Sequence, residues 1–245
     1  MLSLSAQLVP SLTQHPGASF AAIVGLGLVL GMRHSTDPDH VVAVSAIVAR
    51  ERSVPQGTLI GALWGLGHTV TIVAVGAAII LFKLVIPPRL GLSMELAVAA
   101  MLILLGILNL TGVLNRITHH FTPNAEPTKR TLRNTFGLFH LLRPLAIGLV
   151  HGLAGSAAVA LLVLSMIPSP TWAVAYLAVF GIGTVLGMML MTTAMAIPIA
   201  LTGKNTTRTL TLISGLASIC FGLFLVYQIG FVEGLFTAHV HWVPS

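Results

Sequence analysis

Residues 33–40 read RHSTDPDH and lie in the middle of an apolar stretch that extends from position 18 to position 49. Five side chains of this octapeptide are ionisable: Arg33, His34, Asp37, Asp39 and His40. An ionised side chain at the centre of a bilayer costs about 2.5–3.5 kcal/mol on insertion scales, so ionisable residues persist there where they serve a function. The octapeptide therefore predicts a polar site inside a hydrophobic protein.

The same residues predict a break between two helices. The residue before a proline is pushed out of the helical region, so the first helix should end at Asp37. Pro38 suits the first position of a new helix, with Asp37 as its N-cap and Asp39 in its first turn, where negative charge favours the helix dipole. The alternative is a surface loop between two spans. It is disfavoured because residues 41–49 are too short to cross a hydrocarbon core about 30 Å thick.

The rest of the sequence has the composition of a membrane protein. Of the 245 residues, 56% are hydrophobic and 7% are charged, whereas soluble domains carry about 25% charged residues. Six apolar stretches are candidate transmembrane helices: 18–49, 56–82, 93–115, 137–167, 171–201 and 209–231. The expected fold is an all-α polytopic membrane protein with six transmembrane helices in a single domain, 1–245.

Three of these stretches are too long for a simple span or are interrupted. The expected breaks lie at Pro38 in the first stretch, at Gly152 and Gly155 in the fourth, and at Pro198 near the end of the fifth. Broken helices are tolerated at membrane depth where the freed backbone is buried in protein or lines a cavity. Discontinuous helices are therefore part of the expected fold.

The positive charges indicate how the protein is oriented in the membrane. The net charge is +6, but the basic residues lie between apolar stretches, so we expect no nucleic-acid partner. The first, third and fifth loops hold most of them: Arg50, Arg52, Arg116, Lys129, Arg130, Arg133, Lys204 and Arg208. We expect a multi-pass protein of the inner (cytoplasmic) membrane. The positive-inside rule places these three loops in the cytoplasm and both termini on the extracytoplasmic side. Residues 1–17 lack a basic segment, so no cleavable signal peptide is expected.

The two halves of the chain resemble each other. Residues 31–34, GMRH, recur as GLVH at 148–151, and GLGH at 65–68 recurs as GIGT at 181–184. The expected division is repeat one at 17–115, a cytoplasmic loop at 116–136, repeat two at 137–231 and an external tail at 232–245. Because each half has three spans, the halves enter the membrane from opposite sides. Such an inverted repeat is typical of secondary transporters, whose sites lie at broken helices near the midplane.

The octapeptide has the residue types of a transition-metal site. His34, Asp37 and His40 are spaced by three and should converge across the break. Asp39 adds a second carboxylate, and His68 in the second stretch offers a third imidazole. Imidazole with carboxylate suits borderline divalent cations such as Ni²⁺, Co²⁺ or Zn²⁺. We therefore predict a metal site formed by His34, Asp37, Asp39, His40 and His68, with Arg33 pairing with a carboxylate or extending towards the membrane surface.

These motifs resemble those of the nickel/cobalt transporter (NiCoT) family. Residues 34–40 fit its H-x4-D-H signature, and LGHT at 66–69 is similar to its second motif. HGLAGSA at 151–157 is typical of a shorter branch, the UreH-type urease accessory proteins. The resemblance covers residues 20–210 and implies a transporter with Ni²⁺ or Co²⁺ as its substrate, no prosthetic group, and supply of a nickel enzyme such as urease.

The second half departs from the larger members of that family. Where those members carry acidic residues, 151–157 and 187–193 hold none, which leaves the metal and the direction of transport open. His151 takes the repeat position of His34, and we keep two interpretations of it, a ligand along the transport path and a packing residue. Ser156 and Thr184 are small polar candidates along the same path.

Other classes of function fit less well. Ser156 lies five residues after His151, and a hydrolase pairing of the two would leave the octapeptide unexplained, so no enzymatic activity is expected. A membrane accessory protein for nickel-enzyme maturation remains the alternative outside transport. The expected partners are a divalent transition-metal ion and the lipid bilayer, and the sequence leaves formation of a homo-oligomer open.

Overall fold

The computed structural model describes residues 16–49, 51, 53–82, 86–113, 138–153, 167, 169–201, 204–237 and 239–242. Over this part of the chain every regular element is a helix. The elements are α2 (Pro16–His34), α3 (Pro38–Val48), α4 (Val54–Phe82), α5 (Pro88–Thr111), α8 (Leu138–His151), α10 (Pro170–Leu201), α11 (Lys204–Tyr227) and the short π-helix η2 (Gln228–Val232).

The predicted break in the first apolar stretch is confirmed. Helix α2 ends at His34, and α3 begins at Pro38 after an extended residue, Asp37, with φ −61° and ψ 147°. Asp37 takes the N-cap position as expected, and its carbonyl oxygen accepts the backbone N–H of Val41 at 3.0 Å. Its side chain makes no capping hydrogen bond. The carboxylate is therefore free to bond elsewhere.

Four of the described helices are long and apolar enough to cross a membrane. Their apolar segments are Val54–Ile79, Pro88–Thr111, Thr171–Leu201 and Thr207–Val232. They correspond to the second, third, fifth and sixth predicted stretches. The shorter apolar helices Ala22–His34, Pro38–Val48 and Leu141–His151 belong to the first and fourth stretches, two of the three with predicted breaks. The all-α membrane class is thus supported, with α2, α3 and α8 as the short segments.

The predicted breaks have different outcomes. In the fourth stretch α8 ends at His151, and a turn follows at Gly152, as expected; Gly155 lies outside the described residues. In the fifth stretch α10 continues through Pro198 to Leu201, so the break expected at Pro198 is wrong. Proline removes one backbone N–H donor. Because Pro198 lies in the last turn of α10, the loss of this hydrogen bond does not end the helix before Leu201.

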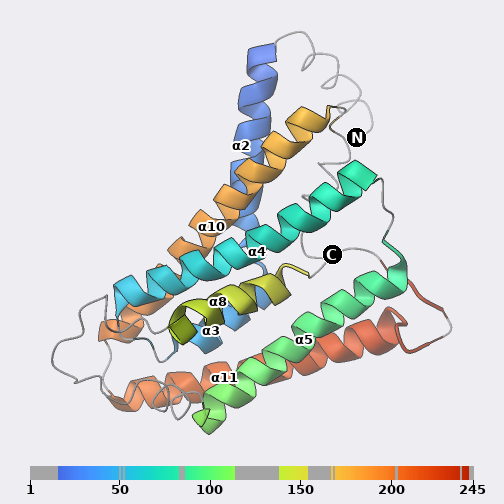
Figure 1. Cartoon of the computed structure of the whole chain (residues 1–245). Coiled ribbons are helices and arrows are strands. Elements are labelled where there is room, and N and C mark those ends of the chain that lie inside the picture. Colours follow the sequence, from blue (N-terminus) through green and yellow to red (C-terminus); the bar gives the residue numbers. More distant parts are fainter. Residues whose placement is uncertain are drawn as a thin grey trace, which may run out of the picture.

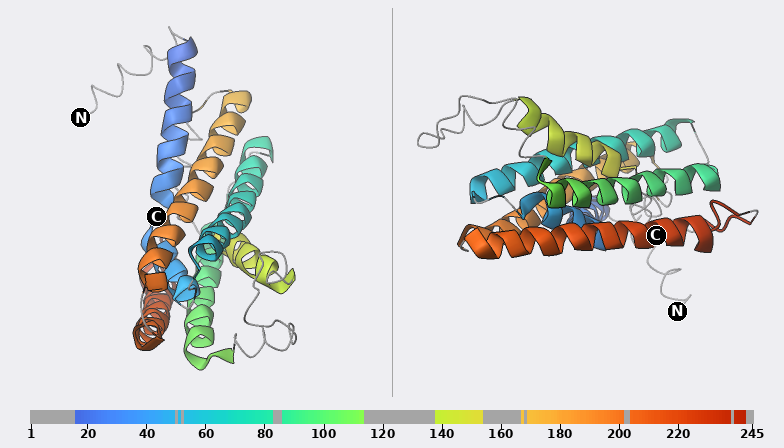
Figure 2. Two further views of the ribbon diagram at one scale, coloured as in Figure 1. Left: turned by 90° about the vertical axis from the view of Figure 1, so that its left-hand side faces the viewer. Right: turned by 90° about the horizontal axis from the view of Figure 1, so that it is seen from below.

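The helices form two packed groups (Figure 1). Helices α4 and α10 pack against each other, with α2 on α10 and α8 on α4, while α5 and α11 form a second, antiparallel pair. The short helix α3 lies between the groups and contacts α5, α10 and α11. Figure 2 shows the α5–α11 pair running side by side along one edge of the molecule. This arrangement brings the ends of α2 and α8 and the start of α3 into the interior.

Glycine allows the short helices to approach the long ones closely. A Cβ at Gly31 of α2 would collide with the backbone oxygen of Phe180 in α10, and one at Gly148 of α8 would collide with the backbone oxygen of Trp64 in α4. Gly148 lies 117 positions after Gly31, and Phe180 lies 116 positions after Trp64. The α2–α10 and α8–α4 contacts therefore use corresponding residues of the two halves.

A second set of contacts follows the same correspondence. Gly67 of α4 approaches the backbone oxygen of Leu145 in α8, and Gly183 of α10 approaches that of Leu28 in α2. Gly183 lies 116 positions after Gly67, and Leu145 lies 117 positions after Leu28. Small residues at helix contacts are how membrane helices pack closely without a hydrophobic driving force between them.

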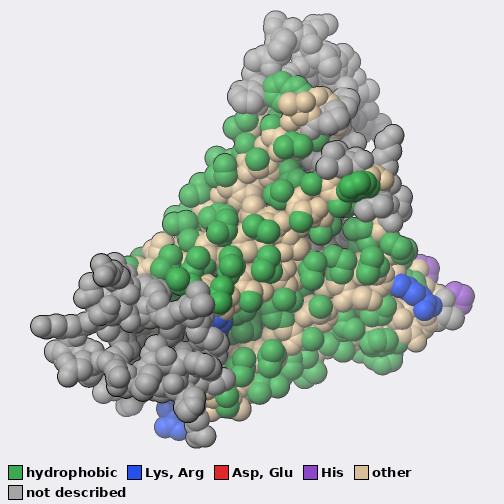
Figure 3. Space-filling view, viewed as in Figure 1, with side chains coloured by type: hydrophobic (Ala, Val, Ile, Leu, Met, Phe, Trp, Pro, Cys, Tyr) green, Lys and Arg blue, Asp and Glu red, His purple; other side chains and the backbone are tan. Residues whose placement is uncertain are grey.

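Over the described residues the interior is mostly apolar, apart from the histidines described below and a few buried polar contacts such as Asn109 with Ser214 between α5 and α11. Its main cluster gathers Val44 of α3, Trp64 of α4, Leu102 of α5 and Met188 of α10, all buried. The outer surface is apolar too: on the face in Figure 3 hydrophobic side chains cover the broad middle, and Lys and Arg side chains lie towards its two ends. An apolar exterior of this kind suits contact with lipid.

Candidate metal centre

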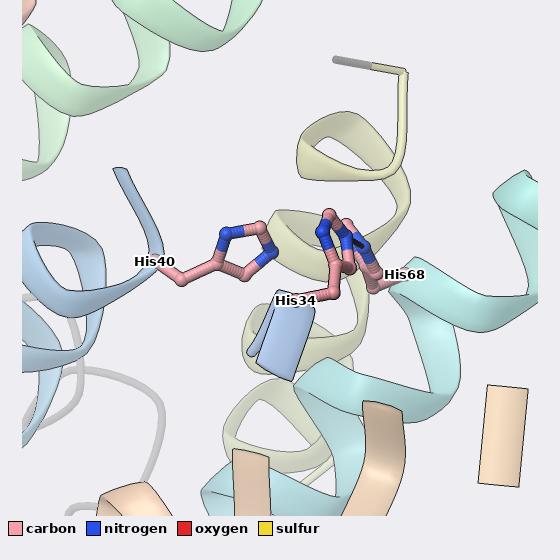
Figure 4. A group of neighbouring side chains, drawn as sticks. All are labelled: His34, His40 and His68. Carbon is pink, nitrogen blue, oxygen red and sulfur yellow. Dashed lines mark hydrogen bonds between the residues drawn. The ribbon is translucent and has the colours of Figure 1, made fainter. Parts of the chain in front are cut away.

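Four histidines from four helices meet in the interior. They are His34 at the end of α2, His40 in the first turn of α3, His68 within α4 and His151 at the end of α8. Each is at most 5% exposed. The ring centroid of His40 lies 4.7 Å from that of His34, 4.9 Å from that of His68 and 4.3 Å from that of His151. Figure 4 shows the His40 ring pointing from α3 towards the rings of His34 and His68.

His34 is held by the carboxylate that follows it. Its Nδ1 lies 2.8 Å from Oδ2 of Asp37, and because a carboxylate only accepts, Nδ1–H of His34 donates this bond. The lone pair of His34 is therefore on Nε2. That atom faces Nε2 of His68 at 2.8 Å, while Nδ1 of His68 is buried with no hydrogen-bond partner among the described residues. The Asp37 carboxylate thus fixes which nitrogen of His34 faces the cluster.

His40 repeats this arrangement with Asp39. Its Nδ1 donates to Oδ1 of Asp39 at 3.0 Å, which leaves the lone pair on Nε2. This Nε2 is buried and has no hydrogen-bond partner among the described residues, and in Figure 4 it is turned towards His34 and His68. A buried polar atom without a partner is costly, so it marks a place where a ligand can be bound.

Asp39 also joins the two halves of the chain. Its Oδ2 accepts a hydrogen bond from Nε2 of His151 at 2.9 Å, and its Oδ1 accepts one from the backbone N–H of His40 at 3.0 Å. Nδ1 of His151 is buried without a partner in the described part of the chain. Asp39 therefore links α3 of the first half to α8 of the second through hydrogen bonds to His40 and His151.

The local sequence explains this convergence. The turn between α2 and α3 is only three residues long, so the last residue of one helix, His34, and the first turn of the next, with His40, lie at the same level. Gly67 precedes His68 and lets α8 approach α4 closely, which brings the end of α8, with His151, beside His68. The glycines and the proline break thus position the four imidazoles.

Two overlapping groups in the described residues have donor atoms close enough for one ion. In the first, His34, His40 and His68, and in the second, Asp39, His40 and His151, the donor atoms lie within 4.8 Å of one another. His40 is common to both. The structure therefore brings together all five residues predicted for the metal site, with Asp37 bonded behind His34.

The other predicted residues have different surroundings. His151 is buried in the cluster. Thr184 is buried, and its hydroxyl donates to the backbone oxygen of Phe180 in its own helix at 3.0 Å. Ser156 lies outside the described residues. Arg33 is exposed, and Asp37 and Asp39 pair with histidines instead, so the expected pairing of Arg33 with a carboxylate is not found in the described part of the chain.

Trp64 is a site residue that the sequence analysis missed. Its ring centroid lies 5.5 Å from that of His40 and 5.4 Å from that of His151, and its side chain is fully buried. Trp64 precedes His68 by one helical turn, so the two share a face of α4. That spacing is a signal the sequence contains. Phe180 occupies the corresponding place beside His34, at 5.6 Å.

The donor set has a clear chemical preference. Neutral imidazole nitrogens suit Ni²⁺, Co²⁺, Cu²⁺ and Zn²⁺, whereas Mg²⁺ and Ca²⁺ prefer oxygen ligands. Carboxylates that accept the other ring N–H orient such histidines and raise their basicity. Asp37 and Asp39 are placed to do this for His34 and His40, and their negative charges would balance a divalent cation.

One comparison with known proteins bears on this centre. The chain is 36% identical over 217 residues to the urease accessory protein UreH of Bacillus sp. (strain TB-90), a match that covers 88% of this chain and 95% of that protein. No family model matches the chain, and no solved structure matches it significantly.

Proposed function

The chain belongs to the family of the urease accessory protein UreH, and from this premise we propose that it is a secondary transporter that moves Ni²⁺ across the cytoplasmic membrane. Uptake is the favoured direction, because a relative is named for assisting urease, an enzyme that needs nickel in the cytoplasm. Co²⁺ is the next candidate substrate, since its ligand preferences are close to those of Ni²⁺.

One observation carries the proposal. Three imidazoles are buried among apolar helices, and their Nε2 atoms either face each other or have no hydrogen-bond partner among the described residues. The Nε2 atoms of His34 and His68 face each other at 2.8 Å, and that of His40 is turned towards them without a partner. A structural metal site does not require a position at a helix break among apolar helices, whereas transporters bind their substrates there. We propose that these three histidines bind the ion, held in place by Asp37 and Asp39.

The packing supports a mechanism of alternating access. Gly31 with Phe180 and Gly148 with Trp64 are corresponding contacts in the two halves, as an inverted repeat of 17–115 and 137–231 would give. We propose that the two repeats rock about the histidine centre and expose it to each side in turn. With the basic loops in the cytoplasm, both termini would lie outside.

The relative's name favours one other function. A membrane accessory protein could bind nickel and pass it to an enzyme without moving it across the bilayer. Both functions use the same centre, but only transport changes the amount of metal inside the cell. An exporter, or a transporter of another divalent metal, would use the same centre as well and would change accumulation in a different direction or for a different ion.

The deciding experiment is uptake of ⁶³Ni²⁺ into cells that lack their own nickel importers. It compares the wild type, His40→Ala and a matched control, His239→Ala, whose histidine is exposed and far along the chain. We expect uptake by the wild type and the control, loss of uptake with His40→Ala, and competition by Co²⁺ more than by Mn²⁺. No uptake by a well-expressed wild type would contradict nickel import, and an efflux assay from Ni²⁺-loaded cells would then separate export from an accessory role.

A further inference from the structure

We propose that the centre contains two metal positions that share His40, and that the transported ion passes from one to the other. The first position is formed by His34, His40 and His68, and the second by Asp39, His40 and His151. This inference rests on the proposed transport function. It adds a second binding position, formed in part by the second half of the chain, for the same class of substrate, a divalent transition-metal ion.

The spacing of the second group suits metal ligands. Nε2 of His151 lies 2.9 Å from Oδ2 of Asp39, and Nδ1 of His40 lies 3.0 Å from Oδ1 of the same carboxylate. Two ligands about 2.1 Å from one ion and at right angles to each other lie about 3.0 Å apart. An ion could therefore take the place of these two protons with only small movements of the side chains, each imidazole then carrying its proton on its other nitrogen.

His151 is a buried member of this second group. It is fully buried, and its Nδ1 has no hydrogen-bond partner among the described residues. Its ring lies closer to His40, at 4.3 Å between centroids, than to His68, at 5.9 Å. The His40 and His151 rings come close because the Asp39 carboxylate bonds both of them.

His40 can serve both positions because its two nitrogens face different neighbours. Nε2 is turned towards His34 and His68 (Figure 4), and Nδ1 lies against Asp39. The first position therefore uses one side of the imidazole and the second position the other. The two lone-pair directions of the ring diverge, so the ion leaves Nε2 before Nδ1 binds it, and the ring proton moves from Nδ1 to Nε2 in the same transfer.

The two positions differ in charge and in origin. The first has three neutral imidazoles, all from the first half of the chain, while the second includes a carboxylate and a histidine from α8 in the second half. A site divided between the halves is the kind that their relative movement can form and disrupt. The second position is thus coupled to the motion that alternating access requires.

The test measures Co²⁺ binding by the purified full-length protein through the d–d absorption of the bound ion. It compares the wild type with His68→Thr, His151→Ala and the double variant. Threonine is the residue at the corresponding position of the second half, Thr184, and is chosen to preserve helix packing. We expect His68→Thr to weaken binding by about tenfold or more but to retain a site with an altered spectrum. Adding His151→Ala should abolish that residual site.

Transport provides the second readout. We expect His151→Ala to bind Co²⁺ with an affinity close to that of the wild type, at the first position, yet to lose uptake of ⁶³Ni²⁺ by about tenfold or more. His68→Gln and His151→Gln replace these variants if either is not monodisperse on size-exclusion chromatography. Wild-type uptake by a folded His151 variant, or equal binding by the single His68 variant and the double variant, would overturn the second position.

The two proposals fail in different ways. If the wild type neither binds nor transports Ni²⁺ or Co²⁺, the proposed function is wrong. If the wild type and His239→Ala bind and transport the metal while His40→Ala does not, the proposed function stands. An overturning result from the His151 variants would then remove only the second position.

Discussion

The Nε2 atoms of His34 and His68 lie 2.8 Å apart, although one residue ends α2 and the other lies within α4. Asp37 holds the proton of His34 on the opposite nitrogen, so the lone pair of His34 points at His68. Without a metal, His68 must donate its Nε2–H to this lone pair. With a metal, both nitrogens can bind the same ion, and the pair becomes half of a coordination site.

This pair predicts stabilisation of the protein by its substrate. A ligand present at 100 times its Kd raises the free energy of unfolding by about 2.7 kcal/mol, which corresponds to roughly 5–10 °C in Tm for a chain of this size. We expect Ni²⁺ to raise the Tm of the detergent-solubilised wild type by this amount, and EDTA to reverse the shift. His40→Ala, which removes the imidazole common to both proposed positions, should remove the shift, whereas Mg²⁺ should not produce it even with the wild type.

Asp37 is expected to act through His34. Asp37→Asn keeps the size of the side chain but removes the charge and the obligatory acceptor, and loss of such an outer carboxylate lowers metal affinity by about 10–100-fold. Thr36→Ala is the matched control, because the Thr36 hydroxyl bonds only the backbone oxygen of Arg33 among the described residues. Isothermal titration with Ni²⁺ gives both affinities. Equal affinities for Asp37→Asn and the wild type would contradict this role.

The helix break and the convergence of His34, Asp37 and His40 could be foreseen because both rest on short-range rules. Pro38 fixes the start of a helix, and His34 and His40 lie on either side of it at a distance the chain itself determines. The side chain of Asp37 illustrates the limit of these rules. The sequence indicates an N-cap, and the position is right, but the carboxylate bonds His34 because that imidazole lies within reach across the turn.

The role of His151 depends on long-range packing, which one sequence does not contain. Its position 117 residues after His34 suggested a counterpart, but only the contact between α8 and α4 brings it beside Asp39 and His40. Trp64 differs, because its spacing of one helical turn before His68 already places the two on the same face of α4. The break expected at Pro198 is wrong for the opposite reason. A local rule predicted it, but Pro198 lies in the last turn of α10, where it does not interrupt the helix.

Helix packing provides a prediction with an internal control. A Cβ at Gly31 would collide with the backbone of Phe180, whereas one at Gly25 of the same helix would meet nothing within 4 Å. We expect Gly31→Ala to destabilise the protein by about 1–3 kcal/mol through overpacking. Gly25→Ala should be neutral or stabilising by about 0.5–1 kcal/mol, because alanine favours a helix over glycine. Thermal unfolding of the two variants in the same detergent measures the difference, and a similar Tm for both would contradict the close α2–α10 approach.

The predicted topology can be tested with single cysteines. In a Cys220→Ser background, Ser53→Cys marks the first loop and His241→Cys marks the C-terminal tail. A membrane-impermeant maleimide should label position 241 in intact cells and position 53 only after the membrane is opened. The positive-inside rule gives this order, since Arg50 and Arg52 lie in the first loop. Labelling with the opposite order would invert the proposed orientation.

Trp64 should report the arrival of the metal. Its indole lies 5.5 Å from the ring of His40 and 5.4 Å from that of His151, so an ion bound by His40 lies within a few ångströms of the fluorophore. Paramagnetic Ni²⁺ and Co²⁺ quench indole fluorescence at such short range, and diamagnetic Zn²⁺ quenches it much less. We expect saturating Ni²⁺ to remove most of the Trp64 emission in a Trp172→Phe/Trp242→Phe background.

The control for this signal is His40→Ala in the same background, which keeps Trp64 but removes the ligand shared by both proposed metal positions. Its emission should not respond to Ni²⁺ at concentrations that saturate the parent. If the emission of the parent is unchanged while titration calorimetry shows Ni²⁺ bound, the ion lies away from Trp64, and the histidine centre is not where it binds. Quenching that persists in the His40 variant would place the ion near α4 without His40, and would contradict the shared role of that imidazole.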